Sequence, residues 1–284
     1  MGEGAKRVRY VEGTSLPLYD LRDGGHAVHL PCVRGRTDVC GCFPTGRHYP
    51  GIADLIADAI QNVEGLCHDF EPGSAWEGMP WVVIDFETTG RDAETDRVIE
   101  VGLVTFEKGK ISARESLLVN PGIPVPEESR AVHGITDEEL AGAPDFATVM
   151  PRVLDLLQGK LPVAYNASFD RGFLLAEIAR AAPEGMTPGD MPPAARPDVT
   201  WVDPLVWARE ILKELKSRRL GDVAKHLDVP LEQAHRAAGD AEATGRVLLA
   251  LAPQMPRIYG ELIRLQKRYA AFQEAELAAW KRFR

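Results

Sequence analysis

Two carboxylates, Asp85 and Glu87, lie two residues apart at the end of the short apolar run 81–84. The Thr-Thr-Gly sequence at 88–90 follows, and together these features predict a buried strand that ends in a turn. Because residues i and i+2 of a strand point to the same face, the two acids are expected side by side. Such a pair repels itself unless a cation or a shared proton compensates. The spacing therefore indicates a metal site, although by itself it also fits an acidic strand end in solvent.

Two later motifs place further acids near the starts of helices. Asp170 ends the segment 166–170, which follows a predicted strand and begins a predicted helix. His235 lies in a predicted loop, and Asp240 stands about where the next helix begins. Taken singly, these acids are ordinary helix-start charges and the histidine is a surface residue. Open α/β sheets, however, keep their sites at such strand ends, so the acids are candidates for one common site.

The elements that must position these residues can be read from the hydrophobic pattern. Strands are expected at 81–86, 98–106 and 111–119, with 108–110 as a hairpin turn. The later elements are predicted as a capping box at Thr136 and Glu139, a helix at 146–157, a strand at 161–165, a helix at 167–182, a strand at 200–202, and helices at 205–215, 240–251 and 256–280. This order predicts an α/β fold, with a mixed five-stranded sheet flanked by helices. The proline-rich segment 183–197 is predicted as a surface loop outside the core.

Composition limits the class of protein. A chain of 284 residues with 45% hydrophobic content can bury one large core and has room for a small second domain. No apolar run reaches the roughly 18 to 20 residues needed to span a bilayer, and the first residues lack the apolar stretch of a signal peptide. A cytoplasmic location without membrane association is therefore expected. The net charge of −9 argues against non-specific coating of nucleic acid, but not against a nuclease, because bound cations offset a carboxylate site.

Three regions are expected along the chain. Residues 1–75 form a Cys/His-containing N-terminal region of unknown role, which ends in the turn-like segment 71–74. Residues 76–255 hold all the acidic motifs. Residues 256–284 form an amphipathic helix that either packs on its own core or binds a partner protein.

All four cysteines fall in the N-terminal region. Cys32, Cys40, Cys42 and Cys67, with histidines nearby, have the numbers for a structural Zn²⁺ site. Their spacing is not the paired C-x2-C form of common zinc ribbons. The alternative is that these are core cysteines in a reducing cytosol, where they behave as small apolar residues.

Taken together, the motifs resemble those of the DEDDh-type 3′–5′ exonucleases. The matching segments are 83–90, 166–170 and 235–240, with 132–136 between the first two. The chain is similar over about residues 80–252 to the proofreading epsilon subunit of bacterial DNA polymerase III, and to its relatives RNase T and oligoribonuclease. This resemblance implies a ribonuclease H-like fold for the central region.

The resemblance also assigns roles to the five catalytic candidates. It implies that Asp85, Glu87 and Asp240 hold a metal ion beside the nucleophilic water, that Asp85 also bridges to a second ion, and that Asp170 contributes nearby. Oxygen ligands suit Mg²⁺ or Mn²⁺, and two such ions can support in-line hydrolysis of a phosphodiester. Histidine is the side chain that most readily accepts a proton near neutral pH, so His235 suits the general base that deprotonates the attacking water.

Substrate contacts are expected from two other segments. The backbone around Thr88, Thr89 and Gly90 is predicted to approach the terminal sugar, because Gly90 has no side chain, and the two threonines are expected to donate to the 3′ hydroxyl region. By resemblance, His133 and Ile135 line the groove beside the last bases, with Ile135 as an apolar platform. The basic residues at 216–219 fit either phosphate contacts or ordinary surface.

The predicted function is metal-dependent 3′–5′ exonuclease activity that releases nucleoside 5′-monophosphates, chiefly from DNA, in proofreading or repair. The expected partners are a nucleic acid with a free single-stranded or frayed 3′ end and a DNA polymerase subunit. The alternative is an RNA-trimming exoribonuclease, which differs in how the 2′ hydroxyl is admitted and is not distinguished by these residues. A third possibility is a binding module without catalysis, but none of the five catalytic side chains is missing. The oligomeric state cannot be read from the sequence.

Overall fold

The computed structural model describes 9–10, 17–20 and 26–27 as backbone, and then 65–67, 69–182, 191–231 and 235–282. Contacts divide the chain into two compact units, Met1–Leu66 and Cys67–Arg284. In the first unit, the described strands form a three-stranded antiparallel sheet; they are β1 (Arg9–Tyr10), β2 (Pro17–Asp20) and β3 (His26–Ala27). The second unit holds all the acidic motifs.

The cysteine cluster predicted for the N-terminal region is described at one position. Cys32, Cys40 and Cys42 lie outside the described residues. Cys67 is buried at the start of the second unit, where its thiol donates to Asp69 at 3.4 Å. Burial raises the pKa of this thiol to about 11, so it is protonated at neutral pH. Cys67 thus packs as a small core residue, and the predicted zinc site stays a prediction because its other three cysteines lie outside the described residues.

The sheet of the second unit has four strands in the order β6-β5-β4-β7. Their bounds are β4 (Trp81–Thr88), β5 (Val98–Glu107), β6 (Lys110–Leu118) and β7 (Leu161–Val163). The first three strands are antiparallel neighbours, and β7 runs parallel to β4. The predicted mixed sheet is confirmed, but its fifth strand is not. Val202 makes only an isolated parallel bridge to Val163, because a helix with proline in its first turn starts two residues later.

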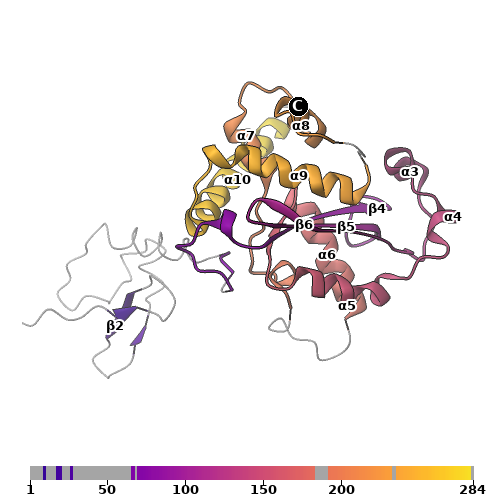
Figure 1. Cartoon of the computed structure of the whole chain (residues 1–284), viewed down its shortest axis with the longest axis horizontal. Helices are drawn as coiled ribbons and strands as arrows, with labels where there is room; N and C mark the ends of the chain where they lie inside the picture. The colour runs from indigo at the N-terminus through magenta and orange to yellow at the C-terminus, as the bar shows by residue number, and fades with distance from the viewer. Residues whose placement is uncertain are drawn as a thin grey trace, which may run out of the picture. The chain divides into compact units, whose positions relative to one another are not determined.

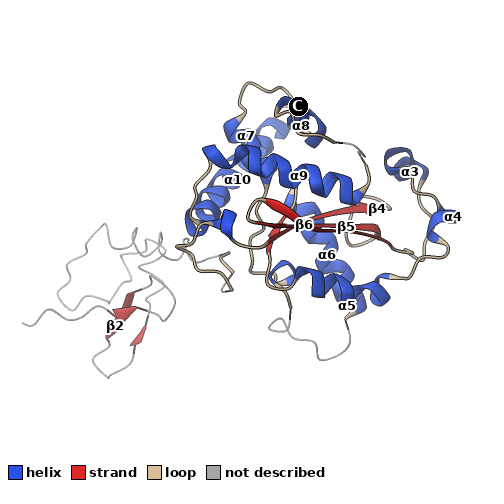
Figure 2. Cartoon of the chain, viewed as in Figure 1, coloured by secondary structure: helices blue, strands red, loops and turns tan. Residues whose placement is uncertain are grey.

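Helices cover both faces of this sheet (Figures 1 and 2). Figure 1 shows α5 (Phe146–Leu157) and α6 (Ala167–Ala181) on one face, and α9 (Ala237–Leu251) on the other. Near α9 lie α7 (Pro204–Ile211), α8 (Leu220–His226) and α10 (Tyr259–Arg282). The short elements are η2 (Trp76–Gly78), α3 (Glu127–His133), α4 (Asp137–Leu140), η4 (Pro193–Ala195) and η5 (Ala252–Gln254).

No helix in the described ranges is long and apolar enough to cross a membrane.

Local sequence signals explain several of these elements. Lys108 and Gly109 both have positive φ, as the tight hairpin turn between β5 and β6 requires. Thr136 and Glu139 form the predicted capping box, which starts α4. The strand β5 is buried along nearly its whole length because helices or other strands cover it on every side, and its sequence is correspondingly apolar.

The proline-rich segment is not wholly a surface loop. Residues 183–190 lie outside the described part of the chain, but Met191, Ala194 and Ala195 belong to the main core cluster. The Trp201 indole donates to the carbonyl of Ala194 at 3.1 Å, which ties η4 to the interior. The prediction of a loop outside the core is therefore wrong for this part, because short apolar side chains between prolines fill space beneath α6.

The first residues of the second unit are bound to the start of α10. The Trp76 indole donates to the carbonyl of Pro256 at 2.9 Å, and the Cys67 amide donates to the Tyr259 hydroxyl at 3.1 Å. Tyr259 itself is fully buried. The predicted region boundary near Trp76 therefore falls inside this unit, and α10 packs through its first turns on its own core.

Candidate active site

Three of the predicted acids meet beside the end of β4. Asp85 and Glu87 point from the same face of this strand, and Asp240 comes from the first turn of α9. Each of the three offers a carboxylate oxygen, and these oxygens all lie within 4.8 Å of one another. Hard divalent cations prefer such oxygen donors. The donor set fits a metal ion, and it is assembled from segments about 150 residues apart in the chain.

The fourth acid, Asp170, holds the second motif against the first. It lies in the first turn of α6 and is 3% exposed. Its Oδ1 accepts a hydrogen bond from the Phe86 amide at 3.0 Å, and Phe86 stands between the two acids of β4. Its charge also acts on Asp85, whose pKa it raises. Asp170 therefore acts electrostatically on Asp85, but it is not among the three acids whose carboxylate oxygens lie within 4.8 Å of one another.

The cluster carries more negative charge than its surroundings compensate. Burial, followed by the charges of Asp170 and Asp240, raises the pKa of Asp85 well above its ordinary value. Burial and the charge of Asp240 raise the pKa of Glu87 to about 8, although Arg236 acts in the opposite direction. Burial likewise raises the pKa of Asp240. These shifts are the electrostatic signature of a site that needs an added cation.

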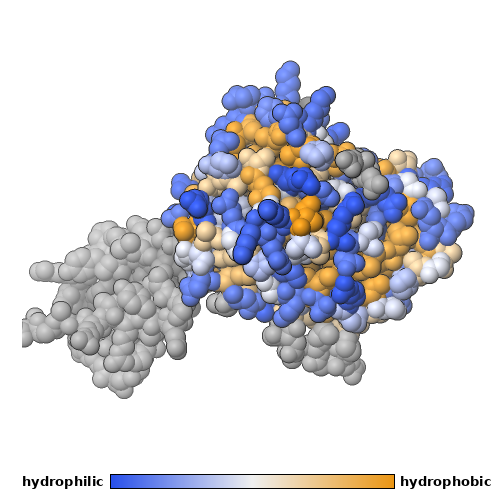
Figure 3. All heavy atoms as spheres, viewed as in Figure 1, coloured by the Kyte–Doolittle hydropathy of each residue, from blue (hydrophilic) through white to orange (hydrophobic). Residues whose placement is uncertain are grey.

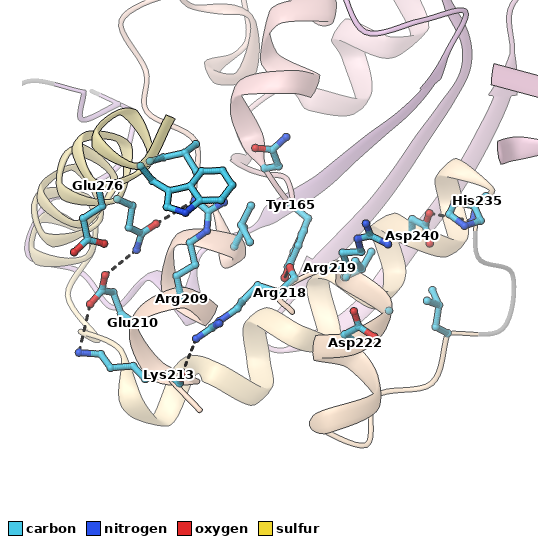
Figure 4. Close-up of a pocket in the computed structure, with 18 residues that line it drawn as sticks. Tyr165, Arg209, Glu210, Lys213, Arg218, Arg219, Asp222, His235, Asp240 and Glu276 are labelled. Atoms are coloured by element: carbon cyan, nitrogen blue, oxygen red, sulfur yellow. Dashed lines mark hydrogen bonds and ion pairs between the residues drawn. The ribbon is translucent and has the colours of Figure 1, made fainter. Parts of the chain in front are cut away.

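His235 lies next to Asp240 at the mouth of the site. Its backbone has a φ of 65°, and its amide donates to Asp240 Oδ2 at 3.1 Å. The side chain is exposed, and both residues line the same open groove (Figure 4). With this left-handed backbone, His235 folds back toward the first turn of α9. Its exposed imidazole therefore stands beside Asp240.

Asp203 was missed from the sequence and positions the second motif. Its carboxylate accepts hydrogen bonds from the amides of Asn166 and Ala167, both at 3.0 Å, where α6 begins. Its own amide donates to Gln266 of α10 at 2.8 Å. The signal was an aspartate directly before Pro204, a pattern that starts a helix. Nothing in that pattern predicts a contact with another helix.

Glu100 was also missed from the sequence, and its side chain holds the start of α9 in place by hydrogen bonds. It faces Glu87 across β4 and β5, and its side chain is 1% exposed. It accepts two hydrogen bonds from Arg236 and one from the Ala237 amide, each at 3.1 Å, and a fourth from Ser116. Burial acts to raise the pKa of Glu100, but these bonds outweigh it and hold the pKa below its ordinary value. The signal available was an acid inside the apolar run 98–106.

In the turn after β4, the threonine hydroxyls that were expected to face the substrate make hydrogen bonds within the turn itself. Thr89 is 1% exposed, and its hydroxyl bonds to Asp96 and to the amide of Arg97. Thr88 is also buried, and its hydroxyl donates to the carbonyl of Gly90. A Cβ on Gly90 would lie 2.3 Å from the Asp96 carboxylate. These contacts explain the Thr-Thr-Gly sequence by the packing of the turn itself.

The two candidates near α3 differ from each other. Ile135 is 1% exposed and packs with Ile99, Val125 and Leu140, so its predicted role as an apolar platform for a base is wrong. His133 is 7% exposed, and its Nδ1 accepts the Ile135 amide at 3.0 Å. Its Nε2 is buried and has no hydrogen-bond partner among the described residues. Burial lowers the pKa of His133, so the ring is neutral at pH 7.

A mixed α/β sheet with clustered carboxylates at one strand end and a histidine beside them is an arrangement that could hold a divalent metal ion. The exonuclease family model matches residues 82–248, more than half of the chain. The chain belongs to this exonuclease family, and it has the acids and the histidine of the DEDDh type.

Curated relatives and solved structures agree with this assignment. The PolC-type DNA polymerase III of Streptococcus pyogenes is 36% identical over 270 residues, and that of Thermotoga petrophila is 29% identical over 251 residues. These matches cover 87% and 88% of this chain but only 17% of each relative, so the chain spans about a sixth of the relatives' length.

Two solved structures share the fold. Escherichia coli exonuclease I, in complex with a dA16 oligonucleotide, has a TM-score of 0.53 at 18% identity and covers 64% of this chain and 42% of that one. The nuclease domain of 3'hExo, a DEDDh family member bound to rAMP, has a TM-score of 0.50 at 17% identity and covers 62% and 92% of the two chains.

Proposed function

We propose that this chain is a metal-dependent 3′–5′ exonuclease that releases nucleoside 5′-monophosphates from single-stranded or frayed DNA ends. One observation carries the proposal: carboxylate oxygens of Asp85, Glu87 and Asp240 lie within 4.8 Å of one another. No positive side chain of the described residues neutralises all three, and a divalent cation would. Asp85, Glu87 and Asp240 would hold it, and Asp170 would take part through its place beside Asp85.

In this proposal His235 acts as the general base. Its side chain is exposed in the groove, next to Asp240, where an attacking water can reach it. An imidazole accepts a proton at neutral pH, whereas the carboxylates of the cluster are occupied as ligands. When bound, Mg²⁺ or Mn²⁺ supplies stabilisation of the charge that develops on the phosphate and on the departing oxygen. His133 stays a proposed contact near the terminal nucleotide through the exposed part of its ring, since its Nε2 is buried and its Nδ1 accepts the Ile135 amide.

The choice of DNA and of proofreading is supported by the relatives. They carry the name DNA polymerase III PolC-type, and this chain matches about a sixth of their length. We therefore propose that the chain works beside a polymerase activity and removes the last nucleotides of a DNA strand. The α/β fold alone does not choose between the sugars, since solved structures with this fold hold either a DNA oligonucleotide or rAMP.

The test is hydrolysis of three labelled substrates in Mg²⁺ or Mn²⁺: a single-stranded DNA, a duplex with a mismatched 3′ end, and a short RNA of the same sequence. We expect mononucleotides from both DNA substrates, and faster release from the mismatched duplex than from a matched one. Equal rates on DNA and RNA would instead indicate general end trimming. Rapid cleavage of RNA with little cleavage of DNA would support the exoribonuclease alternative.

A variant links this activity to the acidic cluster. Asp85→Asn keeps the side-chain shape but removes one charged ligand, so it should lower turnover by several orders of magnitude and weaken Mn²⁺ binding. Glu107→Gln, at the exposed end of β5, is the matched control and should leave both unchanged. Wild-type turnover in Asp85→Asn would disprove the proposed metal site.

A further inference from the structure

An open groove leads away from the acidic cluster along α7, α8 and α10. His235 and Asp240 stand at one end of it, and Glu276 of α10 stands at the other (Figure 4). Trp280 of α10 also lines the groove. Its volume of about 1480 Å³ exceeds the roughly 300 to 1,000 Å³ of sites for small molecules. The groove has room for an occupant longer than one nucleotide. The wall on α10 lies outside residues 82–248, which the family model matches.

One wall of the groove carries arginine and lysine side chains. Arg219, at the start of α8, is drawn between Tyr165 and Asp240 in Figure 4. Its guanidinium has no hydrogen-bond or ion-pair partner within the described part of the chain. Arg209 and Lys213 of this wall make longer contacts, to Gln273 at 3.3 Å and to Glu210 at 4.0 Å. Arg219 is therefore the cation on this wall best able to take a new anionic partner.

The opposite wall presents apolar side chains. Leu277 and Trp280 are 50% and 54% exposed on α10, although both line the groove. Large apolar side chains exposed together inside a groove indicate a surface that another molecule covers. Figure 3 shows hydrophilic and hydrophobic residues interspersed over the visible face of the molecule. The feature that distinguishes the groove is thus its combination of an aromatic wall with a cationic wall.

We infer that the groove binds the single-stranded stretch of nucleic acid that leads to the 3′ end undergoing cleavage. Bases stack on exposed aromatic side chains, while cations along the same path contact the phosphates. The groove begins at His235 and Asp240, where the terminal linkage must lie, so its occupant is continuous with the substrate. Trp280 stacks on a base and Arg219 contacts a phosphate between it and the cluster. This inference rests on the proposed exonuclease function.

The acids of the groove are compatible with this occupant. Asp222 accepts a hydrogen bond from Ser217, and Glu210 accepts one from Gln273 while facing Lys213. Asp240 belongs to the metal-binding group, so a bound cation compensates its charge. Glu276 of α10 also lines the groove and is exposed, so a strand must pass this acid while its phosphates contact the cations of the opposite wall. A protein partner would also cover Leu277 and Trp280, but it would not need to begin at the acidic cluster.

The experiment compares binding of 5′-labelled dT2 and dT12 by the full chain, in Ca²⁺ under conditions where no cleavage is detected. The variants are Trp280→Ala and Arg219→Ala. Phe272→Ala and Arg264→Ala are the matched controls, because both are exposed on α10 and neither lines the groove. Affinity is measured by fluorescence anisotropy over a series of salt concentrations, and circular dichroism checks that each variant is folded.

We expect the wild type to bind dT12 more tightly than dT2. Trp280→Ala should weaken dT12 binding by about 5- to 100-fold, as expected for loss of one stacked base. Arg219→Ala should reduce the slope of log affinity against log salt by about 0.7, the value for one phosphate contact on a single strand. The two controls should behave as the wild type does.

Two outcomes separate this inference from the proposed function. If the wild type cleaves DNA but its affinity does not rise with strand length, the groove is not the strand path and the inference is overturned. The same holds if Trp280→Ala and Phe272→Ala weaken dT12 binding equally. If the wild type cleaves no nucleic acid in Mg²⁺ or Mn²⁺, the proposed function itself has failed.

Discussion

Replacing Glu87 with glutamine should stabilise the metal-free protein and destabilise the metal-bound one. Glu87 shares a half-buried cluster with Asp85 and Asp240, and its pKa is raised to about 8 by burial and by the charge of Asp240. The folded protein therefore holds a proton on this group at pH values where the unfolded chain has released it. As the pH rises from about 4.5 toward 8, the folded state loses stability relative to the unfolded state. A glutamine has no charge to expose to this environment.

The size of the effect follows from the two pKa values. The ordinary value of 4.5 and the folded value of about 8 differ by about 3.5. At about 1.4 kcal/mol for each pH unit, this corresponds to at most ~5 kcal/mol. Solvent reaches part of the cluster and screens the charges, so we expect ~2–3 kcal/mol at pH 8.5. At pH 5 the carboxyl is protonated in the folded protein, and the two proteins should differ little.

The assay is urea unfolding in EDTA at pH 5 and pH 8.5, repeated with Mn²⁺ at pH 8.5. Glu87→Gln should be more stable than the wild type in EDTA at pH 8.5. With Mn²⁺ at about 1,000 times its dissociation constant, the wild type should gain ~4.1 kcal/mol, which exceeds the ~2–3 kcal/mol difference in EDTA, and the order should reverse because the variant binds Mn²⁺ weakly. Glu107→Gln controls for loss of an exposed charge. Equal stability of wild type and Glu87→Gln in EDTA at pH 8.5 would refute the reasoning.

Three further predictions concern the parts that surround the metal group. His235→Ala should lower turnover by ~10²- to 10⁴-fold at pH 7.5 while leaving thermal stability unchanged, and single-turnover rates that match the wild type would exclude it as the general base. Gly102→Ala should cost ~1–3 kcal/mol in urea unfolding and weaken Mn²⁺ binding measured by calorimetry, because a Cβ would lie 2.2 Å from the backbone at the start of α9. Gly142→Ala, which meets nothing within 4 Å, is its control. Glu100→Gln should lower the free energy of unfolding in urea by ~1–3 kcal/mol, because it weakens the buried hydrogen bonds to Arg236 and to the first amide of α9. An unchanged free energy of unfolding would show that these hydrogen bonds are not needed to hold α9.

The local patterns that were predicted correctly share a physical cause. The strands 81–86 and 98–106, the hairpin turn at 108–110 and the helix at 146–157 all depend on periodicity and turn chemistry, which neighbouring residues determine. The errors at Ile135 and in the proline-rich segment arose where distant segments decide the outcome, whereas the error at 200–202 has a local cause. The segment 200–202 has the composition of a strand, yet it pairs at one bridge only because α7 begins immediately after it.

The candidate site divides in the same way. The four acids and the histidine were singled out because their types and order resemble the DEDDh motifs, whereas each of them taken singly fits an ordinary strand-end, helix-start or surface residue. Burial could not be read in this way. Ile135 and Thr89 carry motif-like sequences, but both side chains are turned into the core, and that follows from the packing of Val125, Leu140 and Asp96 around them.

By itself, the sequence determined which chemical groups this protein possesses and the order in which its helices and strands follow one another. The tertiary structure alone decided that Asp85 and Asp240 share one cluster, that Glu100 and Asp203 hold the ends of α9 and α6 in place, and that a groove leads away from the site. The physical reason is the distance along the chain over which each effect acts. Backbone propensities and side-chain chemistry act over a few residues, whereas pKa shifts, buried hydrogen bonds and grooves depend on groups that only folding brings within a few ångströms.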